Sequence, residues 1–275
     1  MAAAGLNPAA VEAILCDADG CLFPSEEPAF AASAKVTNEL LESIGARARY
    51  GAEELRLATT GQNFRTTAAA LAEREGIAVD PLELERWVVR ERYEVSSHLG
   101  RTLRPDREVT VPLWRLRESR RLALVSSSAL PRIEVCLEAT HLDELFGPET
   151  RFSAESSLPK PTSKPDPAIY LFAGEKLGVE GGQALAVEDS VPGAEAAIAA
   201  GFPTVGNVMF VPPAERPAPA AALLAAGAAA IIQSWSELED LLEPGRVLTS
   251  TSSSASSTTR CSSSPPERAI SSPAA

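Results

Sequence analysis

The stretch AILCDADGCLFPSEE, residues 13–27, decides the fold expected of this chain. Its first four residues form a short apolar run, typical of a buried strand, and Asp17 and Asp19 follow just before a glycine. A carboxylate next to a buried strand costs free energy unless a partner neutralises it or chemistry uses it. The pair therefore indicates either a turn or helix cap, or a functional site at the end of a strand.

Downstream of residue 121, short apolar runs alternate with helical ones. The predicted strands are 122–127, 151–156, 184–190 and 203–208, and the predicted helices are 131–140, 167–178, 192–201 and 235–243. Such alternation is typical of an α/β fold with a mainly parallel, Rossmann-like sheet between layers of helices. We expect 9–27 and 105–246 to form this α/β core.

The segment between the first strand and the rest has a different pattern. From about residue 29 to 103, apolar residues recur at helical spacing and no convincing strand is present. We therefore expect an all-helical cap, 28–104, inserted into the core, with hinges near 24–28 and 104–108. RPDREVTVP, residues 104–112, is interpreted as a break in the helical pattern. The Ser-, Thr- and Pro-rich stretch 247–275 predicts a disordered tail.

Composition excludes several classes of partner. The chain has 275 residues and a formal net charge of -12, which argues against nucleic acids and anionic membranes. Its four cysteines form no CxxC pair, as expected in a reducing compartment. The longest apolar stretch, 218–232, contains a proline and a glycine and is too short to span a bilayer. We expect a soluble, cytoplasmic monomer.

Polar groups follow several of the predicted strands. Ligands of open parallel sheets bind beyond the carboxyl ends of the strands, so these groups should meet there. They are Asp17, Asp19, Ser126, Ser127, Ser128, Lys164, Glu188, Asp189 and Ser190. Clustered carboxylates repel one another unless a cation lies among them, and oxygen ligands without histidine favour Mg²⁺. One carboxylate could then attack a bound phosphate, and a second could protonate the leaving oxygen.

Four motifs, in this order, resemble those of the haloacid dehalogenase-like hydrolase superfamily. They are DADGCL, VSSS, SKPDPAIY and AVEDSVPGAEAAIAAG. The helical insertion is similar to the cap of the subgroup that holds β-phosphoglucomutase, phosphoglycolate phosphatase and sugar phosphatases. The resemblance implies an Mg²⁺-dependent phosphatase that hydrolyses a small phosphorylated metabolite, a sugar or organic-acid phosphate, through an aspartyl-phosphate. The alternatives are a phosphomutase on the same scaffold and a non-catalytic phosphate-binding or signalling protein.

The resemblance also implies catalytic and phosphate-binding roles. Asp17 would be the nucleophile and Asp19 the general acid and base. Ser126, Ser127 and Lys164 would hold the transferring phosphoryl group. Lys160 also precedes a proline, but Lys164 is followed by Pro-Asp-Pro and a helix and matches the motif better.

The implied Mg²⁺ ligands are Asp17, the backbone carbonyl of Asp19, Glu188 and Asp189. Glu188 could instead position Asp189 or a metal-bound water. In related caps the loop corresponding to ATTGQNFR, residues 58–65, closes over the core and contacts the substrate. The specificity candidates are therefore Thr60, Gly61, Asn63 and Arg65. The alternative is an ordinary turn between helices, with Arg65 a surface charge.

Overall fold

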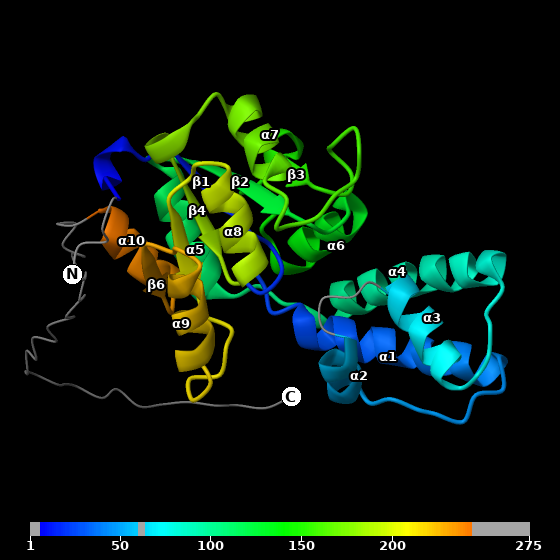
Figure 1. Ribbon diagram of the computed structural model, residues 1–275. Helices are drawn as coiled ribbons and strands as arrows, with labels where there is room; N and C mark the ends of the chain where they lie inside the picture. The colour runs from blue at the N-terminus through cyan, green and yellow to red at the C-terminus, as the bar shows by residue number, and fades with distance from the viewer. Residues whose placement is uncertain (1–5, 60–63, 244–275) are drawn as a thin grey trace, which may run out of the picture. The chain divides into compact units, whose positions relative to one another are not determined.

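The computed structural model describes residues 6–59 and 64–243. Within them, six parallel strands form one sheet in the order β3-β2-β1-β4-β5-β6 (Figure 1). The strands are β1 (Ala13–Cys16), β2 (Arg121–Ser126), β3 (Arg151–Ser153), β4 (Ala184–Glu188), β5 (Thr204–Asn207) and β6 (Ala230–Ile232). The prediction of an α/β fold with a parallel sheet is confirmed.

Helices cover both faces of this sheet. The core helices are α5 (Arg107–Arg117), α6 (Leu130–Thr140), α7 (Ala168–Leu177), α8 (Val191–Ala199), α9 (Pro217–Ala225) and α10 (Trp235–Leu242). Three short 3₁₀ helices are η1 (Pro8–Ala10), η2 (Pro148–Thr150) and η3 (Gly181–Gln183). Ile14 of β1 packs in one cluster with Leu113 of α5 and Leu238 of α10, while Leu15 packs in another with Ile169 of α7. Successive side chains point to opposite faces of a strand, so a strand buried on both sides must be apolar throughout.

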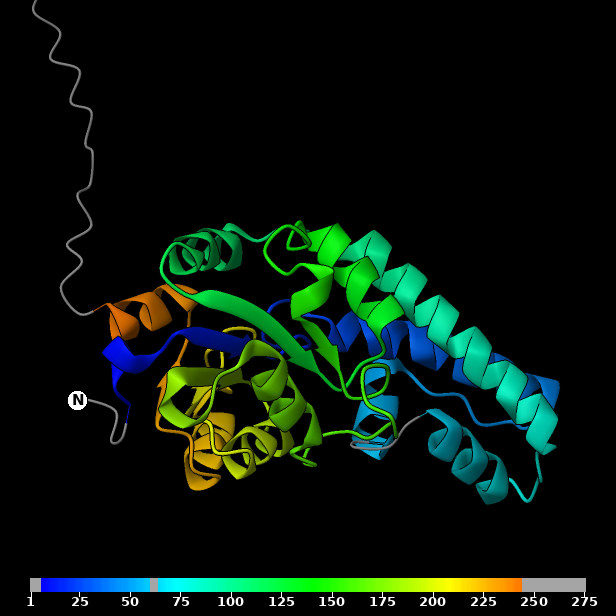
Figure 2. The same cartoon turned by 90° about the horizontal axis from the view of Figure 1, so that it is seen from above.

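The chain between β1 and β2 begins with four helices. They are α1 (Glu26–Ser43), α2 (Ala52–Thr59), α3 (Phe64–Arg74) and α4 (Pro81–Thr102). α1 and α4 run side by side (Figure 2), and Leu40, Leu55 and Leu71 bury their side chains in a cluster of their own. Asp80 caps α4 by accepting hydrogen bonds from the backbone N–H groups of Leu82 and Glu83. The helical nature of this segment is as predicted, and its exact limits as a domain remain a prediction.

One expectation about an individual element is wrong, and two elements were not predicted. The stretch 104–112 was expected to break the helical pattern, but α5 begins at Arg107, capped by Asp106, and contains Pro112. Val109 and Leu113 bury one face of α5, and this packing outweighs the hydrogen bond that the proline removes. The two elements are α9, which begins one residue before the apolar stretch 218–232, and β6, which ends it. Gly227, at φ +105°, lies between them, so a residue without a side chain suits the turn.

Two predicted strands are shorter than expected. β3 ends at Ser153 and β4 ends at Glu188, so Asp189 and Ser190 lie beyond the strand. No helix in the described part of the chain is both long and apolar enough to cross a membrane. The predicted disordered stretch, 247–275, lies outside the described residues.

Candidate active site

Three carboxylates meet at the carboxyl ends of the two central strands. Asp17 directly follows β1, Glu188 ends β4, and Asp189 comes next. One carboxylate oxygen from each lies within 4.8 Å of the other two. Because β1 and β4 pair in parallel, with Cys16 opposite Val187, the register brings these residues to the same edge of the sheet.

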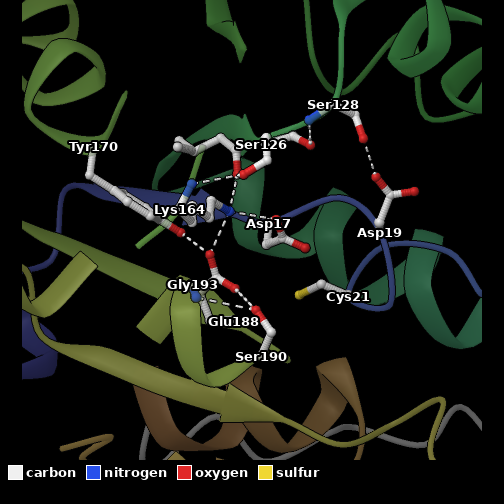
Figure 3. Close-up of polar contacts among 12 residues, drawn as sticks. Asp17, Asp19, Cys21, Ser126, Ser128, Lys164, Tyr170, Glu188, Ser190 and Gly193 are labelled. Atoms are coloured by element: carbon white, nitrogen blue, oxygen red, sulfur yellow. Dashed lines mark hydrogen bonds and ion pairs between the residues drawn. The ribbon is translucent and has the colours of Figure 1, made fainter. Parts of the chain in front are cut away.

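Lys164 neutralises part of this acidic cluster. Its Nζ lies 2.5 Å from Asp17 Oδ1 and 2.5 Å from Glu188 Oε1, and it also donates to the carbonyl oxygen of Val125 at 2.8 Å (Figure 3). Tyr170 of α7 donates its hydroxyl to the same Glu188 oxygen at 2.5 Å. Glu188 is fully buried, and these two donors supply the compensation that a buried carboxylate needs.

The cluster still carries more negative than positive charge. Burial is the main reason that the pKa of Asp17 rises to about 7, and Lys164 only partly opposes it. Burial, together with Asp17 and Glu188, also raises the pKa of Asp189 well above its ordinary value. Burial alone would lower the pKa of Lys164, but Asp17 and Glu188 raise it overall. Three carboxylates beside one ammonium group fit a hard divalent cation, since such an ion takes oxygen ligands and removes the repulsion.

Two glycines make room for this crowding. Gly20, at φ +79°, lies against the Asp189 carboxylate, and a side chain at this position would collide with it. Gly193, in the first turn of α8, lies equally close to the Glu188 carboxylate. The glycine of the DADG motif and that of VPGAE therefore let the acidic side chains approach the backbone.

Asp19 lies in a different environment from Asp17. Its Oδ1 accepts hydrogen bonds from the hydroxyl of Ser25 and, at 2.7 Å, from Nη2 of Arg132. Its Oδ2 accepts from the hydroxyl of Ser128 at 2.7 Å (Figure 3). Burial works to raise the pKa of Asp19, but Arg132 and the two hydroxyls outweigh it and hold the pKa below its usual value.

The serine loop after β2 joins these two environments. Ser126 is buried, and its Oγ accepts the backbone N–H of Ser128 at 3.0 Å. Ser127 Oγ accepts the backbone N–H of Lys164 at 3.1 Å. The loop thereby ties the Lys164 segment to β2 and directs Ser128 toward Asp19.

The structure brings most of the predicted site residues together and leaves some apart. The residues around one strand-end site are Asp17, Asp19, Ser126, Ser127, Lys164, Glu188 and Asp189. Thr60, Gly61 and Asn63 lie outside the described residues. Arg65 is exposed on α3 and forms an ion pair with Glu85 of α4, and no recorded contact joins it to the acidic cluster.

No role was predicted from the sequence for four residues that donate hydrogen bonds to Asp19 or Glu188. They are Ser25, Ser128, Arg132 and Tyr170. Ser128 was among the strand-end groups expected to meet at the site, but its contact with Asp19 was not predicted. Ser25 precedes α1 inside the predicted hinge. Arg132 and Tyr170 lie inside helices, where only the packing of those helices against the sheet reveals what their side chains face.

Comparisons with known proteins agree with this geometry. A model of the haloacid dehalogenase-like hydrolase family matches residues 11–201, more than half of the chain, and the chain belongs to this family. A solved family hydrolase from Deinococcus radiodurans, with bound phosphate and sodium, is 28% identical, with a TM-score of 0.63 over 85% of this chain and 96% of that one. A putative β-phosphoglucomutase from Thermotoga maritima is also 28% identical, with a TM-score of 0.62 over 84% and 97%.

A third solved structure contains a ligand. It is an aspartate-to-asparagine variant of CbbY from Rhodobacter sphaeroides in complex with xylulose-1,5-bisphosphate. That protein is 26% identical, with a TM-score of 0.61 over 83% of this chain and 96% of that one.

Curated relatives match only over short segments. A haloacid dehalogenase-like hydrolase domain-containing protein of Arabidopsis thaliana is 40% identical over 86 residues, which are 31% of this chain and 27% of that protein. The plasmid CbbY protein of Cupriavidus necator is 57% identical over 42 residues, 15% of this chain and 16% of that protein. The matched segments thus span about a quarter and a sixth of these relatives, respectively.

Proposed function

We propose that this protein is an Mg²⁺-dependent phosphatase that hydrolyses a small phosphorylated metabolite, a sugar or organic-acid phosphate, through an aspartyl-phosphate. One observation carries the proposal. Lys164 Nζ lies 2.5 Å from both Asp17 and Glu188, inside a cluster of three carboxylates, with Asp19 two residues from Asp17. A nucleophile, a cation, a metal-ligand set and a second carboxyl group are the parts that two-step phosphoryl transfer needs.

In the first step, Asp17 attacks phosphorus through a carboxylate oxygen. The bond from phosphorus to the alcohol oxygen breaks, and Asp19, whose pKa the negative charge of the bound phosphate raises so that it is protonated in the substrate complex, gives its proton to that oxygen. In the second step, a water attacks phosphorus, Asp19 takes the proton of the water, and the bond between phosphorus and Asp17 breaks. Inorganic phosphate leaves, and both carboxyl groups return to their starting states.

Other groups would hold the phosphoryl oxygens and the metal. Ser126, Ser127 and Lys164 would neutralise and bind the transferring group. The Mg²⁺ ligands would be Asp17, the backbone carbonyl of Asp19, Glu188 and Asp189, and the ion would offset negative charge on the phosphate. Arg65 and the loop residues Thr60, Gly61 and Asn63 remain candidates for substrate selection.

A phosphomutase is the alternative, and it is favoured by the likeness to the putative β-phosphoglucomutase. Both activities use the same aspartyl-phosphate. A mutase returns the phosphoryl group to a sugar hydroxyl, whereas a phosphatase passes it to water. The fate of the intermediate therefore distinguishes them.

The test is phosphate release from a panel of sugar and organic-acid phosphates, with Mg²⁺ or with excess chelator. Parallel reactions include a sugar bisphosphate. We expect release from one or a few members, in Mg²⁺ only, whether or not the bisphosphate is present. The Asp17→Asn variant, purified in the same way, controls for a contaminating phosphatase. Isomerised sugar phosphate without free phosphate would establish the mutase, and no reaction with folded protein would refute both.

A further inference from the structure

Arg132 occupies an unfavourable place for a cation. It is the third residue of α6, and the first turn of that helix contains no acidic residue. The free N–H groups of a helix N-terminus carry partial positive charge, so a cation there weakens the helix. The position of Arg132 is therefore not explained by the stability of its own helix.

The guanidinium group is held by Asp19. Its Nη2 lies 2.7 Å from Asp19 Oδ1, a charge-assisted hydrogen bond between residues 113 positions apart. Its Nε is buried and finds no hydrogen-bond partner among the described residues. An unpaired buried donor costs free energy, and Glu91 of α4 places a second negative charge near the guanidinium group, although the recorded hydrogen bond is the one to Asp19.

The donors around Asp19 differ in how firmly they fix its orientation. Ser25 precedes α1 and Ser128 precedes α6, and each contributes a hydroxyl group. A hydroxyl hydrogen rotates to suit its acceptor, whereas a guanidinium group is planar and rigid. Arg132 is thus the donor best able to fix the direction of the carboxyl group.

The side chains of Asp19 and Arg132 are 30% and 29% exposed, so neither is sealed from the site. Asp17, the proposed nucleophile, makes its recorded ion pair with Lys164 instead. The contacts of Arg132 and Lys164 therefore divide the two aspartates between two different cations.

We propose that Arg132 is a positioning residue for Asp19, which it orients for proton transfer to the leaving oxygen. This inference rests on the proposed function. Among the described residues Arg132 has no recorded contact with the nucleophile Asp17, so its role is to act through Asp19. Asp19 still gives its proton as the bond from phosphorus to oxygen breaks and regains a proton from water in the second step.

The inference predicts that the effect of Arg132 depends on the leaving group. A sugar alkoxide must be protonated as it leaves, whereas p-nitrophenolate departs without a proton. The experiment compares kcat/KM for the best sugar phosphate of the panel and for p-nitrophenyl phosphate, because kcat/KM reports the steps up to release of the alcohol. The variants are Arg132→Met, Arg132→Gln and Arg132→Lys.

We expect Arg132→Met and Arg132→Gln to lower kcat/KM for the sugar phosphate on the order of 100-fold, and for p-nitrophenyl phosphate less than about threefold. Arg132→Lys keeps the positive charge but loses the planar guanidinium group, so it should recover only a small part of the loss. An equal loss for both substrates would indicate a structural or phosphate-binding role and would overturn the inference. No loss for either substrate, or a change confined to KM, would overturn it as well.

Arg115→Met is the matched control. Arg115 of α5 forms its own ion pair with buried Glu239 of α10 at 3.4 Å, so the change removes the same charge from a similar pair in the core. We expect it to leave the ratio of the two kcat/KM values unchanged, and a similar change in the ratio would count against a specific role of Arg132. Thermal melting of every variant checks folding. A wild-type protein that hydrolyses neither substrate would refute the proposed function and this inference with it, whereas an active wild type with an unchanged ratio in the variants refutes the inference alone.

Discussion

Asp17 and Asp19 are two residues apart, yet the regions around them are opposite in character. The Asp17 region is an acidic cluster with Glu188 and Asp189, in which burial raises the pKa of Asp17 to about 7. The Asp19 region is a ring of donors, in which Arg132 and two serine hydroxyls hold the pKa below its ordinary value. The same side chain thus acquires two different electrostatic states from its neighbours.

This difference fits two separate roles, with Asp17 as nucleophile and Asp19 as acid and base. A cluster of negative charge is a place for a metal ion and a phosphate. A carboxyl group held by directional donors is one whose orientation matters, as it does for an acid and base. At neutral pH the lowered pKa of Asp19 favours its carboxylate, the form that acts as base toward water in the second step, so Asp19 takes up a proton before it acts as acid in the first.

The largest effect is expected from Asp17→Asn. An amide is not a nucleophile toward phosphorus, so kcat should fall by on the order of 10⁴-fold or more, and no phosphoenzyme should form. Mass spectrometry after incubation with substrate measures the phosphoenzyme, and circular dichroism checks that the fold is retained. Retained turnover would remove Asp17 from the mechanism and with it the contrast between the two aspartates.

Asp19→Asn should have a smaller effect, which depends on the step. Loss of the acid and base should slow turnover on the order of 10²- to 10⁴-fold. Because Asp17 remains, a phosphoenzyme should still form from p-nitrophenyl phosphate and then persist, since no base activates water. Full activity with a sugar phosphate would show that Asp19 is only a structural acceptor for its donors.

Lys164→Met tests the role of the one ammonium group in the acidic cluster around Asp17. Removal of the ammonium group leaves Asp17 and Glu188 without their shared cation, so we expect kcat to fall on the order of 10²- to 10³-fold. Lys160→Met is the matched control, because Lys160 also precedes a proline but has no recorded contact with the cluster. Equal effects of the two changes would argue that Lys164 contributes only general charge.

The sequence predicts most residues of the acidic cluster around Asp17. Asp17 follows β1, Glu188 ends β4 and Lys164 precedes α7, and a parallel sheet brings the ends of its strands to one edge. Order along the chain is then enough to predict that these residues meet.

The hydrogen-bond donors to Asp19 are harder to predict, because their placement depends on helix packing. Arg132 reaches Asp19 only because α6 begins beside it, and the sequence around Arg132 does not predict this contact. The same limit explains α5 and β6. Pro112 looks like a helix breaker until the burial of Val109 and Leu113 is known, and β6 is recognisable only by its pairing with β5.

The smallest predicted effect concerns stability without metal, and it should have opposite signs for the two aspartates. A raised pKa means that the folded protein holds the Asp17 proton more tightly than the unfolded chain does. The stability from this group is therefore fully present below about pH 4 and is lost as the pH rises through about 7. The lowered pKa of Asp19 gives stability above its ordinary pKa, which is lost as the pH falls through the lowered value.

Thermal and urea unfolding in chelator at pH 5 and pH 8 measure this contrast. At pH 8, Asp17→Asn should stabilise the protein, by at most about 4 kcal/mol for a pKa shift of this size, because it removes a buried charge. Asp19→Asn should destabilise it by about 1–3 kcal/mol, because it removes the acceptor of charge-assisted hydrogen bonds. Added Mg²⁺ should stabilise the wild type at pH 8 more than it stabilises Asp17→Asn, since the ion relieves the same repulsion. If both variants shift stability in the same direction, the two carboxyl groups do not occupy opposite environments and the two separate roles inferred from them are wrong.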